Sequence, residues 1–193
     1  MSRRLLITGF EPFGGNCVNP SWEAVQALPE QIGDFVLCKQ KLSTVFGKAA
    51  NQVLETAEAF LPDVILCVGV AAGRPAVTPE RIAVNIRDAR IPDNAGRQPR
   101  GEFVDPHGPA AYFATVPVEK MAQAICAAQL PGAVSNSAGT FVCNDTLYTL
   151  LHHYAGTHVR VGFIHVPALP GTESPGLSLP DTVAALIAAI KTC

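Results

Sequence analysis

The chain has 193 residues, of which 48% are hydrophobic, so it can build one ordinary core, and we expect a single domain over residues 1–193. Lys and Arg number 14 against 16 Asp and Glu, a formal net charge of −2. This balance excludes the strong basic field that attracts nucleic acid or an anionic membrane.

Neither end of the chain predicts a membrane segment. Glu11 and Pro12 interrupt the first apolar run before it resembles a signal peptide, and the apolar run at 183–190 is too short to span a bilayer. We therefore expect a cytoplasmic protein. The 6 cysteines form no C-x-x-C pair and no Cys/His spacing suits zinc, so we expect neither a disulfide framework nor a metal site.

Strand-like runs rich in Val, Ile and Leu alternate with helix-like segments along the chain. In chain order, we predict strands over residues 3–10, 34–42, 63–71, 81–89, 133–139 and 158–167. Between and after them we predict helices over residues 19–28, 46–60, 117–130, 143–155 and 178–193. Residues 90–110, with 4 Pro and 3 Gly, predict a long irregular loop.

Local signals support the ends and faces of these helices. Asn19 or Ser21 is a candidate N-cap of the first helix, and Ser178 of the last. In the helix over 143–155, the apolar residues recur at helical spacing, which predicts a face turned to a core: Leu147, Leu150, Leu151 and Tyr154.

This alternation predicts an α/β fold, a three-layer α/β/α sandwich with a mostly parallel twisted sheet and helices on both faces. Functional loops in such sheets gather at the carboxyl ends of the strands. The segments expected there are GFEPFGG, GVAAGRP, SAGTFVC and HVPALP.

Cys143 stands after Gly139 and Thr140, at the predicted start of a helix. The unpaired N–H groups and the dipole of a helix N-terminus favour a thiolate, and the same amides suit the oxyanion of a tetrahedral intermediate. The alternative is a buried, inert thiol, because most free cysteines behave as small hydrophobes. Position alone leaves both interpretations open.

A cysteine nucleophile needs a histidine to accept its proton and a third group to orient the imidazole. His165 is the best placed histidine, since it ends a strand just before Pro167, and Glu80 precedes another predicted strand. The alternatives are a strand-end histidine with structural partners and a surface carboxylate paired with Arg81.

The remaining candidates lie on loops. Phe10 and Phe13 stand on the glycine-rich turn GFEPFGG, where they suit either the core or a ligand platform. Arg90 suits polarising a carbonyl, or only fixing its loop through Asp88 or Asp93. Because G-x-G-x-x-G and G-x-x-x-x-G-K are absent, we do not expect the GFEPFGG turn to be a phosphate loop.

Together these segments resemble the pyroglutamyl peptidase I family, also called pyrrolidone-carboxylate peptidases, which are cytosolic cysteine peptidases. The resemblance runs nearly end to end and is carried by long strings in the family's order: ITGFEPFGGNCVNPSWEAV, STVFGKA, TPERIAVNIRDARIPDNAGRQP, GPAAYFATVPV, SNSAGTFVCNDTLY and GFIHVPALP. It implies removal of an N-terminal pyroglutamyl residue from peptides without metal or cofactor, by a homo-oligomer, either a tetramer or a dimer.

The resemblance also implies roles for individual residues. Cys143 would be the nucleophile, His165 its base and Glu80 the orienting acid. The residues implied for substrate binding are Phe10, Phe13, Asn19, Thr44, Val70, Arg90, Ile91, Phe141 and Val142. The chain departs from the family pattern in GVAAGR, where Val70 replaces a common Gln and Ala72 a common Gly.

Three other functions remain as alternatives. The first is a non-catalytic binder of modified N-termini, the second a thiol redox sensor using Cys143 with Cys17 or Cys67, and the third an open α/β nucleotide-binding enzyme. The motif positions of Cys143, His165 and Glu80 argue against the first, and the missing phosphate loop argues against the third.

Overall fold

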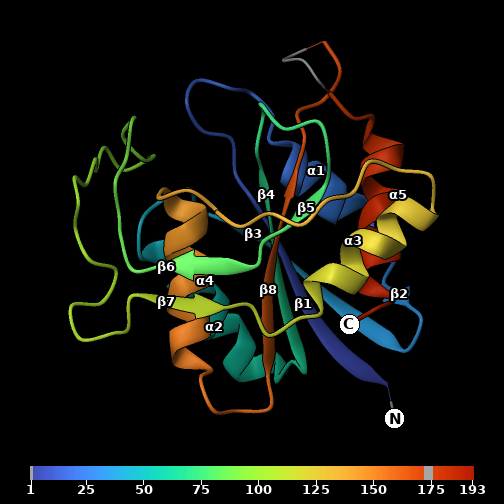
Figure 1. Cartoon of the computed structure of the whole chain (residues 1–193), viewed down its shortest axis with the longest axis horizontal. Coiled ribbons are helices and arrows are strands. Elements are labelled where there is room, and N and C mark those ends of the chain that lie inside the picture. The colour runs from blue at the N-terminus through green and yellow to red at the C-terminus, as the bar shows by residue number, and fades with distance from the viewer. Residues whose placement is uncertain (1, 172–175) are drawn as a thin grey trace.

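A six-stranded sheet forms the middle layer of the computed structural model, which describes residues 2–171 and 176–193 (Figure 1). The strand order is β2-β3-β1-β4-β8-β5. The strands are β1 (Arg3–Phe10), β2 (Gln31–Ile32), β3 (Phe35–Leu42), β4 (Val64–Val70), β5 (Thr78–Pro79) and β8 (Arg160–Val166). The four central strands β3, β1, β4 and β8 are parallel, and only the two short edge strands are antiparallel to their neighbours.

Helices cover both faces of this sheet, as the sequence predicted. The helices are α1 (Pro20–Ala27), α2 (Lys48–Phe60), α3 (Val118–Ala127), α4 (Val142–His153) and α5 (Leu179–Ile190). The side chains of α1, α3 and α5 share one core with the sheet, and those of α2 and α4 share the other, so the fold has three layers (Figure 1).

The two-residue period of the strands divides their side chains between the two cores. On β4, Leu66 and Val68 face the core of α1, α3 and α5, whereas Ile65 and Cys67 face the core of α2 and α4. On β8, Phe163 also faces the α2 and α4 side. His165, two residues after Phe163, therefore points toward the same side as the start of α4.

Two predicted strands differ from the structure. Of residues 81–89, only Ile82–Val84 form a strand, β6, which pairs with β7 (Ala111–Phe113) in a separate two-stranded sheet. The strand ends because the Ile86 N–H bonds back to the Val84 carbonyl at 2.9 Å. The prediction did not foresee that these residues belong to a small two-stranded sheet separate from the main sheet.

Residues 133–139 form no strand either. Single bridges join Val77 to Gly132 and Glu80 to Ser135. Beyond them the Ser135 hydroxyl accepts from the Ser137 N–H and the Ser137 hydroxyl accepts from the Gly139 N–H. Such local side-chain bonds compete with a strand ladder, so the segment before α4 is irregular.

The other predicted elements are confirmed with small shifts at their ends. Asn19 caps α1 and Ser178 caps α5, each accepting from a backbone N–H of the first turn. Residues 90–110 form neither helix nor strand. Among the described residues, no helix is long and apolar enough to cross a membrane.

Candidate active site

His165 and Glu80 face each other at the carboxyl end of β8. The Thr78 position of β5 pairs with His165, and the Glu80 N–H bonds to the Phe163 carbonyl at 2.9 Å, so the backbone holds the acid beside the imidazole. His165 Nδ1 lies 2.7 Å from Glu80 Oε1. Because Nδ1 is engaged by Glu80, the other ring nitrogen, Nε2, is available to a different group.

Glu80 is fully buried, at 0% exposure, and its carboxylate is held by polar partners. Arg74 Nη1 donates to Glu80 Oε1 at 2.6 Å. Burial alone would raise the pKa of Glu80, but the hydrogen bond and charge of His165, with the hydrogen bond from Arg74, lower it below its ordinary value. Glu80 is therefore a carboxylate, not a carboxylic acid, across neutral pH.

The alternative of a surface Glu80 paired with Arg81 is wrong. The Arg81 guanidinium turns away and bonds to Asn136 Oδ1 and Glu119 Oε1, both at 2.9 Å. Arg74, which the sequence analysis did not single out, is the cation at Glu80. Nothing in the local sequence distinguishes the two arginines.

Cys143 lies in the first turn of α4, whose N-cap is Phe141. Its position beside the sheet follows from Gly69 of β4, where an added Cβ would lie 3.0 Å from Cys143 Sγ. Gly69 is the register partner of His165. Cysteine and histidine thus flank the same point at the end of β4, although within the described residues no hydrogen bond joins them.

The Cys143 thiol is neutral in the resting state. Burial raises its pKa to about 12, the negative charge of Glu80 and the neighbouring Cys67 add to the rise, and Arg74 and the residue's own N–H oppose it. A preformed thiolate is therefore not stored here, so a base must take the proton when the sulfur reacts.

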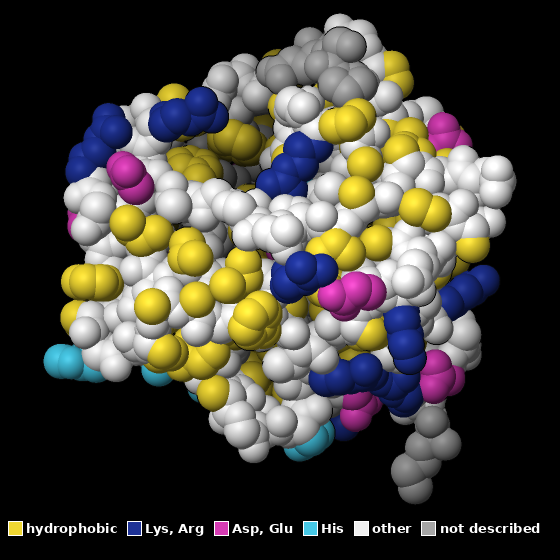
Figure 2. Space-filling model, in the orientation of Figure 1, with side chains coloured by type: hydrophobic (Ala, Val, Ile, Leu, Met, Phe, Trp, Pro, Cys, Tyr) yellow, Lys and Arg dark blue, Asp and Glu magenta, His cyan; other side chains and the backbone are white. Residues whose placement is uncertain are grey.

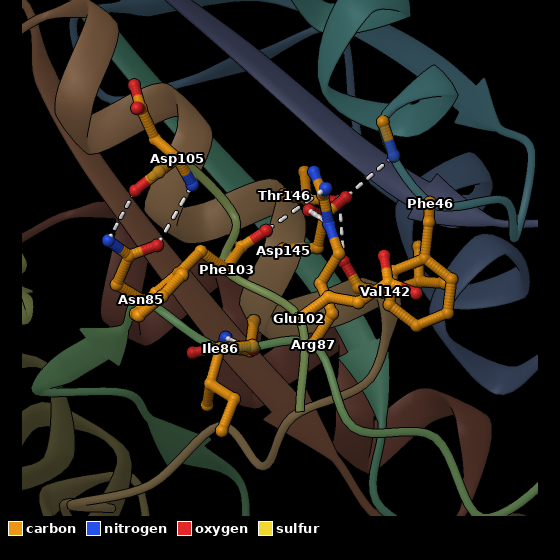
Figure 3. A network of polar contacts seen from close by, with 12 residues as sticks. Phe46, Asn85, Ile86, Arg87, Glu102, Phe103, Asp105, Val142, Asp145 and Thr146 are labelled. Carbon is orange, nitrogen blue, oxygen red and sulfur yellow. Dashed lines mark hydrogen bonds and ion pairs between the residues drawn. The ribbon is translucent and has the colours of Figure 1, made fainter. Parts of the chain in front are cut away.

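Residues just after Cys143 anchor the start of α4 to β6, to the segment that follows β6 and to the residue before α2. Asn144 Oδ1 accepts from the Val84 N–H at 2.9 Å, and its Nδ2 donates to the Val84 carbonyl at 2.8 Å. Asp145, at 0% exposure, accepts from Arg87 Nε at 2.6 Å and from the Gly47 N–H at 2.7 Å (Figure 3). These bonds fix the helix turn that carries the thiol.

Aromatic rings gather next to this turn. Phe141 packs on Phe13 with ring centroids 6.0 Å apart and on Phe46 at 5.3 Å. Phe13 and Phe141 are partly exposed, whereas Phe46 is buried. Phe10 lies in the core at 2% exposure, with its ring 6.2 Å from that of Phe163. Phe46 was missed by the sequence analysis, because the contact joins residues far apart in the chain.

A polar network underlies the GFEPFGG turn. The Glu11 carbonyl accepts from Asn19 Nδ2 at 3.0 Å and from the Thr44 hydroxyl at 3.1 Å. Glu11 Oε1 accepts from the Thr44 N–H at 3.0 Å and from Asn94 Nδ2 at 2.9 Å. Asn19 and Thr44 are both buried, so they support the turn from below. Glu11 and Asn94 are the supporting residues that sequence reasoning missed.

The other candidates occupy different surroundings. Ile91 is 44% exposed, and its Cδ1 would lie 3.7 Å from a Cβ added at Gly14, so the loop after Arg90 reaches the GFEPFGG turn. Arg90 is exposed. Val142 is buried in the core at 0% exposure. Val70 pairs with Val166 and, one residue after Gly69, turns its side chain from the face of Cys143.

These residues lie at one edge of the sheet, where the parallel strands end. Figure 2, in the orientation of Figure 1, shows the surface hollowed over this edge, with hydrophobic side chains on the walls of the hollow. Among the described residues, no group of three or more His, Cys, Asp or Glu is arranged to hold a metal ion. The arrangement suits a thiol, a base and an acid beside a small apolar depression.

Known proteins resemble this chain over nearly its full length. The model of the pyroglutamyl peptidase family matches residues 3–193. A pyrrolidone-carboxylate peptidase of Levilactobacillus brevis is 49% identical over 195 residues, covering 97% of this chain and 96% of the relative. That of Staphylococcus aureus is 48% identical over 196 residues, covering 97% and 92%.

Solved structures agree with this match. Pyroglutamyl peptidase I of Bacillus amyloliquefaciens superposes with a TM-score of 0.95 at 43% identity, covering 99% of this chain and 96% of that one. Pyrrolidone carboxyl peptidase of Thermococcus litoralis gives 0.93 at 35% identity, covering 98% and 92%.

Proposed function

This chain belongs to the pyroglutamyl peptidase family, and from that premise we propose that it removes the N-terminal pyroglutamyl residue from peptides by thiolate attack. Cys143 is the proposed nucleophile, His165 the base and Glu80 the orienting acid. The 2.7 Å contact between His165 Nδ1 and Glu80 Oε1, beside the thiol at the end of β4, is the observation that carries the proposal.

In the proposed reaction, the Cys143 thiol transfers its proton to the free nitrogen of His165 as sulfur attacks the pyroglutamyl carbonyl carbon. The raised pKa of Cys143 keeps the sulfur protonated until His165 takes the proton. The ionised Glu80 stabilises the imidazolium that forms. We assign the developing oxyanion to the first N–H groups of α4, because the first turn of a helix leaves its N–H groups without helical partners.

The intermediate then collapses. The carbon–nitrogen bond of the scissile amide breaks, His165 returns the proton to the leaving amine, and a thioester remains on Cys143. Water attacks the thioester with His165 again accepting a proton, which releases free pyroglutamate and restores the thiol. Atoms and protons balance without any other reactant.

Recognition of the lactam follows from its chemistry. A pyroglutamyl ring is small and uncharged, so it needs an apolar slot with a few amide partners. We propose that Phe10 and Phe13 flank the ring, that Phe141, Val142, Thr44 and Ile91 complete the slot, and that Arg90 approaches the reacting carbonyl. The partly exposed Phe13 and Phe141 support this slot, and the buried Phe10 and Val142 would contribute from behind.

Val70 and Asn19 enter the proposal differently. Since the Val70 side chain faces away from Cys143, the backbone N–H and C=O at this position are the groups offered to the lactam. A prolyl residue lacks the lactam carbonyl and carries a charged amine, so it would leave these partners unpaired. Asn19 supports the turn that bears Phe13.

Hydrolysis of a pyroglutamyl fluorogenic amide, measured beside its prolyl analogue, tests the proposal. We expect turnover of the first and none of the second, abolished in Cys143→Ser and unchanged in Cys126→Ser, whose exposed thiol lies on α3. Equal turnover of both substrates would reject the specificity, and a fully active Cys143→Ser variant would reject the nucleophile.

We also propose a cytoplasmic location and a homo-oligomer, either a tetramer or a dimer. Phe103 and Phe113 are 64% and 69% exposed, and large exposed aromatics of this kind suit contact between copies. Light scattering after size exclusion should give a multiple of the 20.3 kDa chain mass. A mass equal to one chain at micromolar concentration would contradict the assembly.

A further inference from the structure

Arg74 joins three segments that the site depends on. Its Nη1 donates to Glu80 Oε1 at 2.6 Å and to the Thr78 hydroxyl at 2.8 Å. Its Nη2 donates to the Ser137 carbonyl at 2.7 Å, in the irregular segment that leads into Cys143. One guanidinium therefore contacts the acid, the edge strand beside His165 and the approach to the nucleophile.

The backbone brings Arg74 to this place. After β4 the Ala71 N–H bonds to the Val166 carbonyl, and the Arg74 N–H bonds to the Ala71 carbonyl, both at 2.9 Å, so the chain turns back over the sheet edge. The Arg74 side chain is 31% exposed, whereas the Glu80 side chain is 0% exposed. The Arg74 guanidinium thus lies between the buried Glu80 carboxylate and the solvent.

We propose that Arg74 is a positioning residue for the reaction, holding Glu80 ionised toward His165 and tying the segment before Cys143 to the acid. This inference rests on the proposed function. In this inference the loop between Val70 and Glu80 takes part in catalysis through Arg74, in addition to contacting the substrate through the loop backbone.

Arg74 matters to Glu80 because one buried carboxylate oxygen has to accept two hydrogen bonds. Glu80 Oε1 accepts from both His165 and Arg74, and a buried carboxylate is costly without a cation and hydrogen bonds. The titratable groups around it are His165 on β8, Arg74 after β4, and the Cys143 and Cys67 thiols. Arg74 is the permanent cation in this set, so its loss leaves the site more negative.

Arg81 is a matched control for Arg74. It follows Glu80 directly, is 38% exposed, and bonds to Asn136, next to Ser137 in the same segment. Its charge, however, is paired with Glu119 on α3 rather than with the acid. A purely structural effect of releasing the segment 135–137 should therefore appear in both arginine variants.

The experiment compares Arg74→Met, Arg74→Lys and Arg81→Met in the full chain. We expect the acid limb of kcat/KM for a pyroglutamyl amide to move to higher pH in Arg74→Met, because Glu80 loses the cation that favours its ionised form and takes up a proton more readily. Arg74→Lys, which retains the charge, should show little of this shift and keep a profile close to that of the wild type. Arg81→Met should keep the wild-type profile.

A second readout does not need turnover. The rate of iodoacetamide alkylation at Cys143, followed by mass mapping of its peptide at pH 8, should be lower in Arg74→Met than in the wild type, since a higher pKa leaves a smaller thiolate fraction. The reason is that Arg74 opposes the rise in the Cys143 pKa. Arg81→Met should alkylate at the wild-type rate.

Identical profiles and alkylation rates for Arg74→Met and Arg81→Met would overturn the inference. A shift in Arg74→Lys as large as in Arg74→Met would overturn it too, since charge would then be irrelevant. If Arg74→Met does not fold, Arg74→Gln carries the same comparison. Failure of the proposed function is a separate result: the wild type would not hydrolyse the amide, while alkylation would still report on Arg74.

Discussion

Gly69 offers a sharp test of how the thiol is seated. It is the register partner of His165 on β4, and it faces the start of α4. A Cβ added there would lie 2.8 Å from Phe163 Cζ, 2.9 Å from Phe163 Cε1 and 3.0 Å from Cys143 Sγ. Gly69→Ala therefore inserts one methyl group between the sheet and the proposed nucleophile.

The size of the effect follows from these distances. Ordinary contacts between such atoms are about 3.5–4.0 Å, so the ring and the sulfur must together give way by about 0.5–1 Å. Overpacking of this kind costs about 1–3 kcal/mol of stability. A misplacement of about 1 Å at a reacting group costs about 10²-fold in rate. We expect kcat/KM to fall by about 10²-fold in a protein that still folds.

The assay measures kcat/KM on a pyroglutamyl amide and the Tm of the same preparation. A loss of about 1–3 kcal/mol should lower Tm by about 2–12 °C in a chain of this size. Gly73→Ala is the control, because Gly73 is exposed in the following loop and a Cβ there meets nothing within 4 Å. It should keep kcat/KM within about twofold.

Wild-type kcat/KM in a folded Gly69→Ala variant would refute the reasoning, because the thiol would then tolerate displacement or would not be the reacting group. A drop in Tm without any loss of rate would refute it equally. Loss of rate in Gly73→Ala as well would show that the loop, rather than the seat of the sulfur, limits the reaction.

Three further predictions follow from the structure. Phe13→Ala should raise KM with little change in Tm, whereas Phe10→Ala should lower Tm because Phe10 is buried; a native KM in Phe13→Ala would remove it from the lactam slot. Arg87→Met should destabilise the fold by about 3 kcal/mol in urea unfolding, because it leaves the buried Asp145 without its cation; an unchanged midpoint would contradict this. Because folding lowers the pKa of Glu80, this group stabilises the fold at pH values above its ordinary pKa of 4.5, and that stability is lost as the pH falls through the lower pKa of the folded state. Glu80→Gln should therefore lose Tm less steeply below pH 4.5 than the wild type does. Parallel curves of Tm against pH would argue against an ionised Glu80.

Local patterns in the sequence were enough to predict most elements and the α/β class. The apolar runs of β1, β4 and β8 and the helical spacing in α4 each reflect a face that must be buried, and that requirement is written in consecutive residues. The same patterns placed Cys143 at a helix start and His165 at a strand end. The resemblance supplied the family and the roles expected of these residues.

Other features depend on residues that are close only after folding. The Arg74 bond to Glu80 and the turn of Arg81 toward Glu119 are decided by which segments the sheet edge brings together, since both arginines lie within six residues of the acid. Phe46 meets Phe141, and Glu11 meets Asn94, across long stretches of chain that carry no mark of the partner.

The segment 133–139 is a case in which the sequence pattern predicted a strand that the structure does not contain. Its composition suits a strand, but Ser135 and Ser137 turn their hydroxyls to neighbouring backbone groups, and the local bonds replace a ladder. The sequence by itself thus determined the layers and the positions of thiol and imidazole along the chain. Only the tertiary structure determined the surroundings of these two groups. Burial, charge pairing and the position of the Cys143 sulfur beside Gly69 arise where segments distant in the sequence pack together.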